Sequence, residues 1–294
     1  MQWLEHCLSS TAPYNVIVVD NNSTDGTVSF IKEHYSTFVL LEQNQNLGFG
    51  KANNLGMRYA LDNGADAVFL LNQDAYLEKG TLEKLVKLQT DEPEYAILSP
   101  IHLNGKGDKL DLNFSKYMNQ GINEEYYSDL VLNHTLKSIY SVPFVIAAGW
   151  LISKPCLITV GGFDPIFFHY GEDDNYCQRV LFHGFKIGVA SNTFLRHDRQ
   201  NKTTKDKEKN SHSEEHYKAY EKSIKVRKAN INIDLTNEFE GLIKRRKLAM
   251  FKSMLKLKFK AAKIYQNDYE FYTRISPEIE ESRKKNKTKG SHYI

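Results

Sequence analysis

Residues 16–26 read VIVVDNNSTDG, a β-branched run that ends on an acid and passes directly into turn-forming residues. An unbroken apolar run of this kind is typical of a strand buried on both faces, as in parallel α/β sheets. Asn, Ser, Asp and Gly in succession favour a turn. With a helix expected from about Thr27, the stretch predicts a strand–turn–helix unit that carries polar groups at the carboxyl end of its strand.

The same alternation of strand and helix continues along the chain. Further strands are expected at 38–41, 67–71, 95–98, 142–152 and 186–190, and helices at 2–10, 51–61, 82–88 and 174–183. Strands that alternate with helices at this interval indicate βαβ units. Residues 101–141, rich in Asn and Tyr, are interpreted as an insertion. We therefore expect an α/β domain over residues 1–200, with a mostly parallel sheet flanked by helices.

Composition and cysteine usage narrow the class of protein. Hydrophobic residues make up 41% and charged residues 26% of the chain, as is usual for a globular domain. Cys7, Cys156 and Cys177 are far apart and form no CxxC pair, which disfavours a disulfide framework or a zinc cluster. No apolar run is long enough to cross a bilayer, and the first residues lack the basic region of a secretory signal. We expect a cytoplasmic protein.

Polar residues follow two of the expected strands. Asp20 and Asn21 come after one, and Asn72-Gln73-Asp74 comes after another. In open parallel sheets ligands bind beyond the carboxyl ends of the strands, where a carboxylate can bind a divalent metal or a ribose hydroxyl. Alternatively, Asp and Asn at these places only initiate turns and cap helices. Two such motifs in order favour a binding site.

Four motifs together suggest a family. They are residues 18–27 (VVDNNSTDGT), 46–56 (NLGFGKANNLG), 70–74 (LLNQD), and the block of 161–164 (GGFD) with 171–179 (GEDDNYCQR). In this order and spacing they resemble the family 2 glycosyltransferases, which have the GT-A fold, and in particular the subgroup with bacterial rhamnosyltransferases. The resemblance covers roughly residues 1–200. It implies an inverting transferase that moves a sugar, such as rhamnose, from a dTDP- or UDP-sugar to a hydroxyl acceptor in cell-surface polysaccharide synthesis.

The resemblance also implies a site for the nucleotide-diphospho-sugar donor. Its expected residues are Asp20, Asn21, Gly48, Gly50, Asn53, Asn72 and Gly149. Asp20 and Asn21 are expected to contact the base and ribose, and the glycines to let the backbone approach the nucleotide closely. Asn21 stands where the wider family has Asp, which favours a dTDP-sugar. The loop at 48–50 is a poor dinucleotide fingerprint, because Asn53 replaces the third glycine and no strand ends directly before it.

A divalent cation, Mg²⁺ or Mn²⁺, is implied as cofactor. By resemblance Asp74 binds it, and the cation neutralises the charge on the departing diphosphate. The chain keeps only the last acid of the family's DxD motif, with Asn72 in the first place. His197 matches a position where many relatives add a histidine ligand, and imidazole favours Mn²⁺. The alternative for His197 is a loop histidine that binds no metal.

The resemblance also implies that the acidic run at 172–174 forms the acceptor side of the site. By resemblance Asp173 is the base that deprotonates the attacking hydroxyl, and Glu172 binds the acceptor or organises the loop. Asp174 and Trp150 are assigned to the acceptor, with Trp150 stacking on a sugar face. The alternatives are that the three acids only cap a helix and that Trp150 is a core residue.

Composition changes after residue 200. We expect a helical basic extension over 201–275 and a disordered tail over 276–294. Residues 241–267 contain no acid and alternate basic with apolar side chains, which predicts a basic amphipathic helix on an anionic membrane surface at the inner face of the cell membrane. Such a helix suits a lipid-linked glycan acceptor. The alternative is a helix packed on the domain with a solvated basic face; nucleic-acid binding is disfavoured, since no stacking platform or known motif is present.

The start of the chain differs from the family pattern. The family begins with a strand and a Thr-Tyr-Asn-like turn, whereas Met1 opens directly into the first expected helix. We therefore expect the first strand to be missing, through a misassigned start or a truncated gene. That feature and the altered metal motif leave a second function open, a non-catalytic sugar-nucleotide-binding protein. A nucleotidyltransferase is disfavoured, because no Gly-rich loop with Arg or Lys opens the chain.

Overall fold

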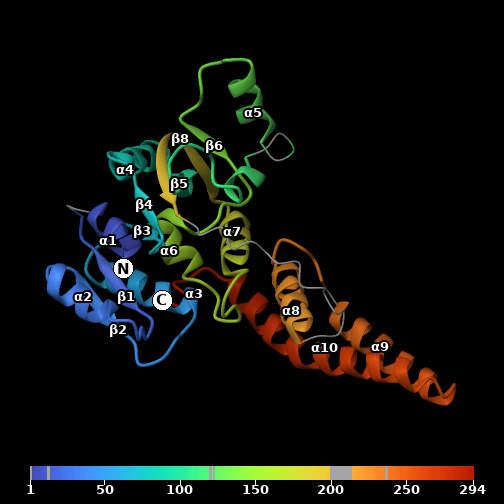
Figure 1. Cartoon of the computed structure of the whole chain (residues 1–294). Helices are drawn as coiled ribbons and strands as arrows, with labels where there is room; N and C mark the ends of the chain where they lie inside the picture. The colour runs from blue at the N-terminus through green and yellow to red at the C-terminus, as the bar shows by residue number, and fades with distance from the viewer. Residues whose placement is uncertain (1, 12–13, 119–120, 122, 199–213, 236–237) are drawn as a thin grey trace.

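An α/β body carries a long helical arm (Figure 1). The computed structural model describes the chain except for residues 1, 12–13, 119–120, 122, 199–213 and 236–237. The strands are β1 (Ile17–Asp20), β2 (Val39–Glu42), β3 (Ala67–Leu71), β4 (Ala75–Leu77), β5 (Tyr95–Asn104), β6 (Ile139–Ser141), β7 (Gly149–Ser153) and β8 (Lys186–His197).

Helices flank these strands and form the arm. They are α1 (Gln2–Ser9), α2 (Thr27–His34), α3 (Phe49–Asp62), α4 (Thr81–Asp91), α5 (Glu124–Val131), α6 (Lys154–Val160), α7 (Glu172–Phe182), α8 (Glu214–Lys228), α9 (Glu238–Leu255) and α10 (Phe259–Asn286), with a 3₁₀ turn at Phe114–Lys116. The strand–turn–helix unit at 16–34 is confirmed, because β1 ends at Asp20 and α2 begins at Thr27.

The strands form two sheets. β1 and β2 pair in parallel, and the larger sheet has the order β3-β7-β5-β8-β4, with β6 also paired to β8. Within the larger sheet β5 and β8 are parallel, whereas the pairs of β7 with β3 and β5, and of β8 with β4 and β6, are antiparallel. The sheet is therefore mixed, and the expectation of a mostly parallel sheet was wrong. An apolar run reports burial on both faces, which interior strands of mixed sheets share, and does not report strand direction.

The largest core lies between the six-stranded sheet and the helices α3, α6 and α7. Three of its fully buried aromatic side chains, Trp150, Phe163 and Tyr176, come from β7, the loop after α6, and α7. The ring of Trp150 stacks on Phe163 with 6.0 Å between ring centroids. This cluster fixes the start of α7 against the carboxyl-end loops of the sheet, which positions the candidate site.

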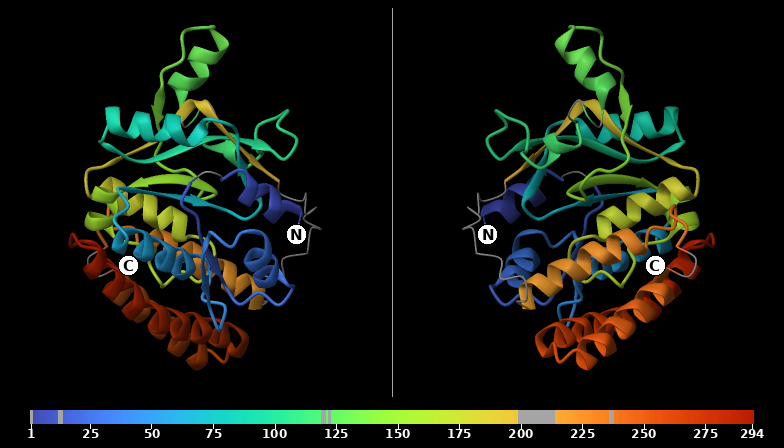
Figure 2. Two further views of the ribbon diagram at one scale, coloured as in Figure 1. Left: turned by 90° about the vertical axis from the view of Figure 1, so that its left-hand side faces the viewer. Right: turned by 90° about the vertical axis from the view of Figure 1, so that its right-hand side faces the viewer.

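Helices α8, α9 and α10 pack together in a smaller core of their own (Figures 1 and 2). Phe167, from the loop between α6 and α7, inserts among Ile224, Phe239 and Ile275 of the three helices. The loop before α7 is thereby joined to the arm. Within the described residues, no helix combines the length and apolarity needed to cross a bilayer.

The last part of the chain differs from the expected disordered tail at 276–294. Helix α10 continues to Asn286, and the carbonyl of His292 then accepts a hydrogen bond from the backbone N–H of Gly162 (2.7 Å). The order has a physical cause, since Ile275 and Ile279 are fully buried. The expected single helix over 241–267 is also replaced, because α9 ends at Leu255 and α10 begins at Phe259.

Candidate functional site

Two loops beyond β1 and β2 are tied together by the predicted polar residues. Asp20 is buried, and its Oδ2 accepts a hydrogen bond from the backbone N–H of Ser23 (3.1 Å). The Oδ1 of Asn21 accepts from the backbone N–H of Leu47 (2.7 Å), and its Nδ2 donates to Asn46 Oδ1 (3.0 Å). Asp20 and Asn21 therefore lie together at the strand end, where they fix the shape of both loops.

The glycines of the second loop face protein rather than open space. Gly48 has φ 81°, and a Cβ there would lie 2.2 Å from the carbonyl oxygen of Phe168. At Gly50 a Cβ would lie 2.9 Å from the Cβ of Phe163. The expected reason for these glycines was close approach to a nucleotide, but the space that they leave is filled by the loop at 163–168. Their small size lets the two loops pack together.

Asn53, an expected donor-site residue, and its neighbour Asn54 make different hydrogen bonds. The Nδ2 of Asn53 donates to the carbonyl of Phe49 within α3 (2.9 Å). Asn54, which the sequence analysis missed, exchanges two hydrogen bonds with the backbone of Phe163: its Nδ2 donates to the carbonyl (2.8 Å), and its Oδ1 accepts from the N–H (2.7 Å). A side-chain amide that pairs with both backbone groups of one residue joins α3 to the acceptor-side loop.

The two predicted metal ligands lie side by side. Asp74 follows β3, and its Oδ1 lies 3.3 Å from Nε2 of His197, at the end of β8. The pairing of β4 with β8 produces this contact, since Ala75 is opposite His197. The side chain of His197 is 2% exposed and that of Asp74 is 39% exposed, so the carboxylate is the part that solvent reaches.

The residues present suit a cation that is shared with a ligand. Adjacent ligands about 2.1 Å from an octahedral ion are about 3 Å apart, close to the separation of these two atoms. Oxygen and imidazole donors suit Mg²⁺ or Mn²⁺. Across the described parts of the chain no group of three or more His, Cys, Asp and Glu side chains could hold a metal ion. Asp74 and His197 would therefore bind a cation together with oxygens of a ligand and water.

Three carboxylates open α7. Gly171 precedes them in a left-handed conformation (φ 93°), and Glu172, Asp173 and Asp174 form the first turn. Burial, with a smaller contribution from the nearby charge of Asp173, raises the pKa of Glu172 to about 7. Burial raises the pKa of Asp174 to about 6, again with a contribution from Asp173. The carboxyl groups thus share a poorly hydrated environment, which a purely helix-capping role does not require.

Asp173 and the Asp74 turn adjoin the same short segment. Burial raises the pKa of Asp173, while the backbone N–H groups of Asp174 and Ala147 and the charge of Lys222 act in the opposite direction. The next residue, Ala148, accepts a hydrogen bond at its carbonyl from the backbone N–H of Asn72 (3.1 Å). The segment 147–148 therefore contacts the base candidate through one residue and the metal-side turn through the other.

Trp150 and Gly149 have structural roles on β7. Trp150 has no exposed surface, and its indole packs against Phe163 and Tyr176. The assignment of Trp150 to a sugar-stacking position was therefore wrong, and the core alternative holds. At Gly149 a Cβ would lie 2.8 Å from Cδ2 of Leu195, so any larger residue would displace that side chain of β8.

The GGFD segment is held by the end of the chain, which the sequence analysis missed. Asp164 is 1% exposed, and its Oδ2 accepts hydrogen bonds from Ser282 Oγ (2.6 Å) and Asn286 Nδ2 (2.7 Å). At Gly161 a Cβ would lie 2.2 Å from the carbonyl oxygen of His292. The signal was present in the sequence: Phe271, Ile275, Ile279, Ser282 and Asn286 recur at helical spacing along one face.

Comparison with known proteins yields one family and several distant relatives. A family model described as Glycosyl transferase family 2 matches residues 2–155. The chain is 23% identical over 208 residues to the dTDP-rhamnosyl transferase RfbF of Shigella flexneri, covering 65% of this chain and 62% of that protein. It is 24% identical over 232 residues to the N-acetylglucosaminyl-diphospho-decaprenol L-rhamnosyltransferase of Mycobacterium tuberculosis, covering 72% and 75%.

Solved structures share the fold at low sequence identity. TarS residues 1–349 of S. aureus, crystallised with UDP, gives a TM-score of 0.52 at 15% identity, over 81% of this chain and 65% of that chain. The mannosyltransferase PcManGT of Pyrobaculum calidifontis, in complex with GDP-Man and Mn²⁺, gives 0.51 at 18% identity, over 83% and 61%. These likenesses confirm the expected GT-A fold.

Proposed function

The chain belongs to glycosyl transferase family 2, and on that premise we propose that it transfers rhamnose, with inversion, from dTDP-rhamnose to a hydroxyl group of a lipid-linked glycan. Two relatives whose names specify rhamnosyl transfer support the sugar, and one of them names a diphospho-decaprenol acceptor. The chain spans 62% of the length of RfbF, so the whole activity is a proposal for this chain.

On the donor side, Asp74 and His197 are proposed to hold a divalent cation jointly with the donor's diphosphate. When bound, such a cation neutralises the negative charge that develops on the leaving diphosphate. Asp20 and Asn21, at the end of β1, are proposed to face the ribose and base. Their hydrogen bonds to Ser23 and Leu47 hold the surrounding loops in place for a nucleotide.

On the acceptor side, Asp173 is proposed as the general base. Direct displacement with inversion requires that the attacking hydroxyl lose its proton as the new bond to the anomeric carbon forms. Burial raises the pKa of Asp173, which strengthens the carboxylate as a proton acceptor. Asp174 is proposed to bind the acceptor, and the more deeply buried Glu172 to organise the turn that carries Asp173.

One observation carries the proposal: the Asn72–Asp74 turn and Asp173 both adjoin the segment 147–148. A leaving-group site and a base must be close for a single displacement step, because both act on one sugar ring. Two carboxylates on distant surfaces would not support this chemistry.

Donor turnover with Mn²⁺ across dTDP- and UDP-sugars tests the proposal. We expect dTDP-rhamnose to be consumed, and Asp173→Asn to reduce turnover about 10²- to 10⁴-fold while dTDP binds as before. Asp66→Asn is the matched control, since its side chain is 96% exposed on the protein surface.

The alternative function gives a different result in the same assay. A non-catalytic sugar-nucleotide-binding protein would bind a dTDP- or UDP-sugar without consuming it, with or without an acceptor. Turnover that survives in Asp173→Asn at the wild-type rate would instead contradict the role of Asp173 and leave the activity itself standing.

A further inference from the structure

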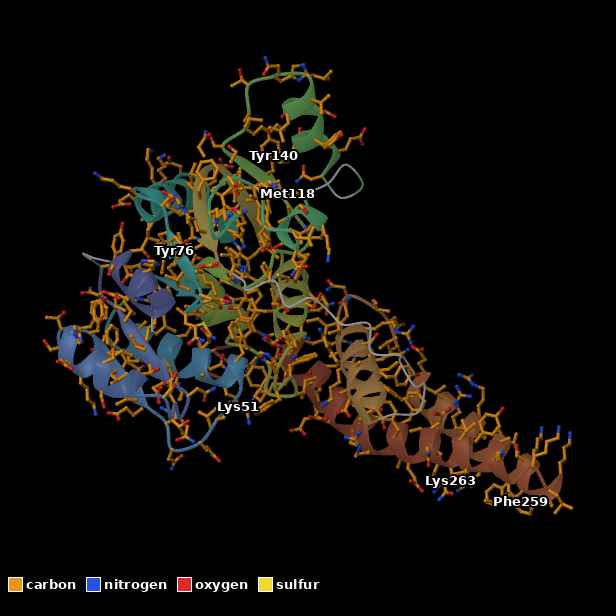
Figure 3. All side chains as sticks on the ribbon, viewed as in Figure 1. Lys51, Tyr76, Met118, Tyr140, Phe259 and Lys263 are labelled. Carbon is orange, nitrogen blue, oxygen red and sulfur yellow. The ribbon has the colours of Figure 1, made fainter. Side chains whose placement is uncertain are left out.

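The far end of the arm exposes a cluster of apolar side chains. We call residues 248–264, which close the hairpin between α9 and α10, the arm tip. Its exposed apolar residues are Leu248 (53%), Phe251 (51%), Met254 (41%), Leu255 (85%), Leu257 (74%), Phe259 (69%) and Ile264 (41%). Figure 3 shows Phe259 near the free end of the arm and Lys263 closer to the body. Apolar side chains gathered at one projecting end mark a surface that contacts a partner.

The turn of the hairpin keeps a leucine in a strained and exposed position. Leu257 has φ 54°, a region that glycine occupies without cost, and its side chain is 74% exposed. The N–H of Lys258 donates to the carbonyl of Ser253 (2.9 Å), which closes the turn in this conformation. A leucine here buries little of its side chain against the folded chain itself. Burial against another surface would account for it.

Basic side chains surround the apolar cluster. No Asp or Glu occurs between 241 and 267. The exposed basic residues are Lys244, Arg245, Lys247, Lys252, Lys256, Lys258, Lys260 and Lys263. The net charge of the whole chain is only +3, so this density is a local feature of the arm. An apolar surface ringed by cations alone complements a surface that is apolar beneath and anionic above.

We propose that the arm tip binds an anionic lipid bilayer, with Leu255, Leu257 and Phe259 inserted at the level of the acyl chains and the surrounding lysines in contact with lipid phosphates. Each cation near an anionic leaflet adds to the attraction, and the inserted side chains leave water. A second copy of the chain is a poorer occupant, because two tips of like charge repel each other. The sequence predicted a helix lying on the membrane surface. In the proposal, the turn between α9 and α10 contacts the membrane instead.

The arm links this surface to the acceptor side of the candidate site. Helix α10 has 28 residues, and at ~1.5 Å per residue it spans about 42 Å. Its other end holds Asp164 through Ser282 and Asn286. Binding at the tip would therefore set the distance between the bilayer and the loop before α7, which on the proposed function receives a lipid-linked acceptor.

Co-sedimentation of the full chain with vesicles tests the surface. We expect partition into phosphatidylcholine vesicles that contain phosphatidylglycerol, little partition into phosphatidylcholine alone, and loss of binding at high salt. Replacing Leu255, Leu257 and Phe259 by Ser should weaken partition at least about tenfold. The matched control replaces Leu130, Val131 and Leu132 by Ser, which are 48%, 64% and 61% exposed at the opposite end of the molecule and should leave partition unchanged (Figure 2).

A second variant separates binding from folding. Leu257→Gly removes an inserted side chain and relaxes the left-handed turn, so partition should fall while the midpoint of thermal unfolding stays or rises. Equal partition into neutral and anionic vesicles, or none into either, would overturn the proposal. So would a tip variant that binds as well as the wild type, retention by a DNA or RNA duplex in place of the vesicles, or sedimentation as a dimer that the tip substitutions dissolve. These outcomes do not depend on donor turnover.

Discussion

The loops beyond β1 and β2 are joined by residues near one another in the chain, whereas the block before α7 is held by residues from its far end. Asn21 and Leu47 are 26 positions apart. Asp164 and Ser282 are 118 positions apart, and Asp164 and Asn286 are 122. The loops beyond β1 and β2 are thus built from local units, whereas the arm holds the block before α7 in place. Substitutions on the two sides should therefore differ in their effect on stability.

The largest effect on stability is expected at Asp164. Asp164→Ala removes the acceptor of Ser282 Oγ and the shorter of two hydrogen bonds from Asn286 Nδ2, and should lower the free energy of unfolding by about 3 kcal/mol. Urea denaturation followed by circular dichroism measures it. A loss below about 1 kcal/mol would show that the arm does not depend on this network.

The hydrogen bonds of Asn54 connect α3 to the loop before α7, and a substitution there measures that connection. Asn54→Ala removes both hydrogen bonds to the buried backbone of Phe163, and should lower the free energy of unfolding by about 2–3 kcal/mol. Asn53→Ala is the neighbouring control, because the hydrogen bond of its Nδ2 stays within α3, and it should change that free energy by less than about 0.5 kcal/mol. Equal losses in the two variants would remove the structural distinction between them.

The buried acid of α7 predicts a pH-dependent effect. The pKa of Glu172 rises from 4.5 to about 7 on folding, so the folded state binds more protons between these values, and its stability falls as pH rises through them. Glu172→Gln should therefore raise the free energy of unfolding by about 2 kcal/mol at about pH 8 and by little at about pH 5. Urea denaturation at both pH values checks this, with Glu33→Gln on the exposed face of α2 as control. A gain that is equal at both pH values would contradict the burial of this charge.

The smallest effect is expected on the donor side. Asn21→Ala removes the acceptor for the backbone N–H of Leu47, which water can replace at this partly exposed site. The free energy of unfolding should fall by about 1 kcal/mol, a third of the loss at Asp164. Urea denaturation of both variants side by side provides the comparison. If Asn21→Ala proves the more damaging of the two, the contrast between the locally built loops and the arm-held block is refuted.

The contrast between short-range and long-range contacts also explains which features the sequence predicted correctly. The β-branched run at 16–19 and the polar turn after it are short-range features, and β1 and α2 lie where they indicated. The neighbouring positions of Asp74 and His197 followed from a family resemblance, and the pairing of β4 with β8 produces them. In contrast, the sequence alone did not reveal that Trp150 would be enclosed by Phe163 and Tyr176.

The disorder expected over 276–294 was wrong, because the many charged residues obscured the buried face of a helix. Glu, Arg and Lys dominate residues 276–289, which favoured disorder, yet Ile275, Ile279, Ser282 and Asn286 share one buried side of α10. The partners of Ser282 and Asn286 lie on a loop that no local pattern connects to them. Long-range docking of this kind becomes visible only in the folded chain.

Calorimetric titration of dTDP in the presence of Mn²⁺ is the most direct test of the proposed roles, in which Asp74 holds the cation and Asp173 acts as the base. Asp74→Ala should weaken binding at least about tenfold, and chelation of the metal should abolish the difference from wild type, because the lost affinity passes through the cation. Asp173→Asn should bind dTDP as wild type does. Equal affinity in all three proteins with Mn²⁺ present, or a loss at Asp173 as large as at Asp74, would contradict the account.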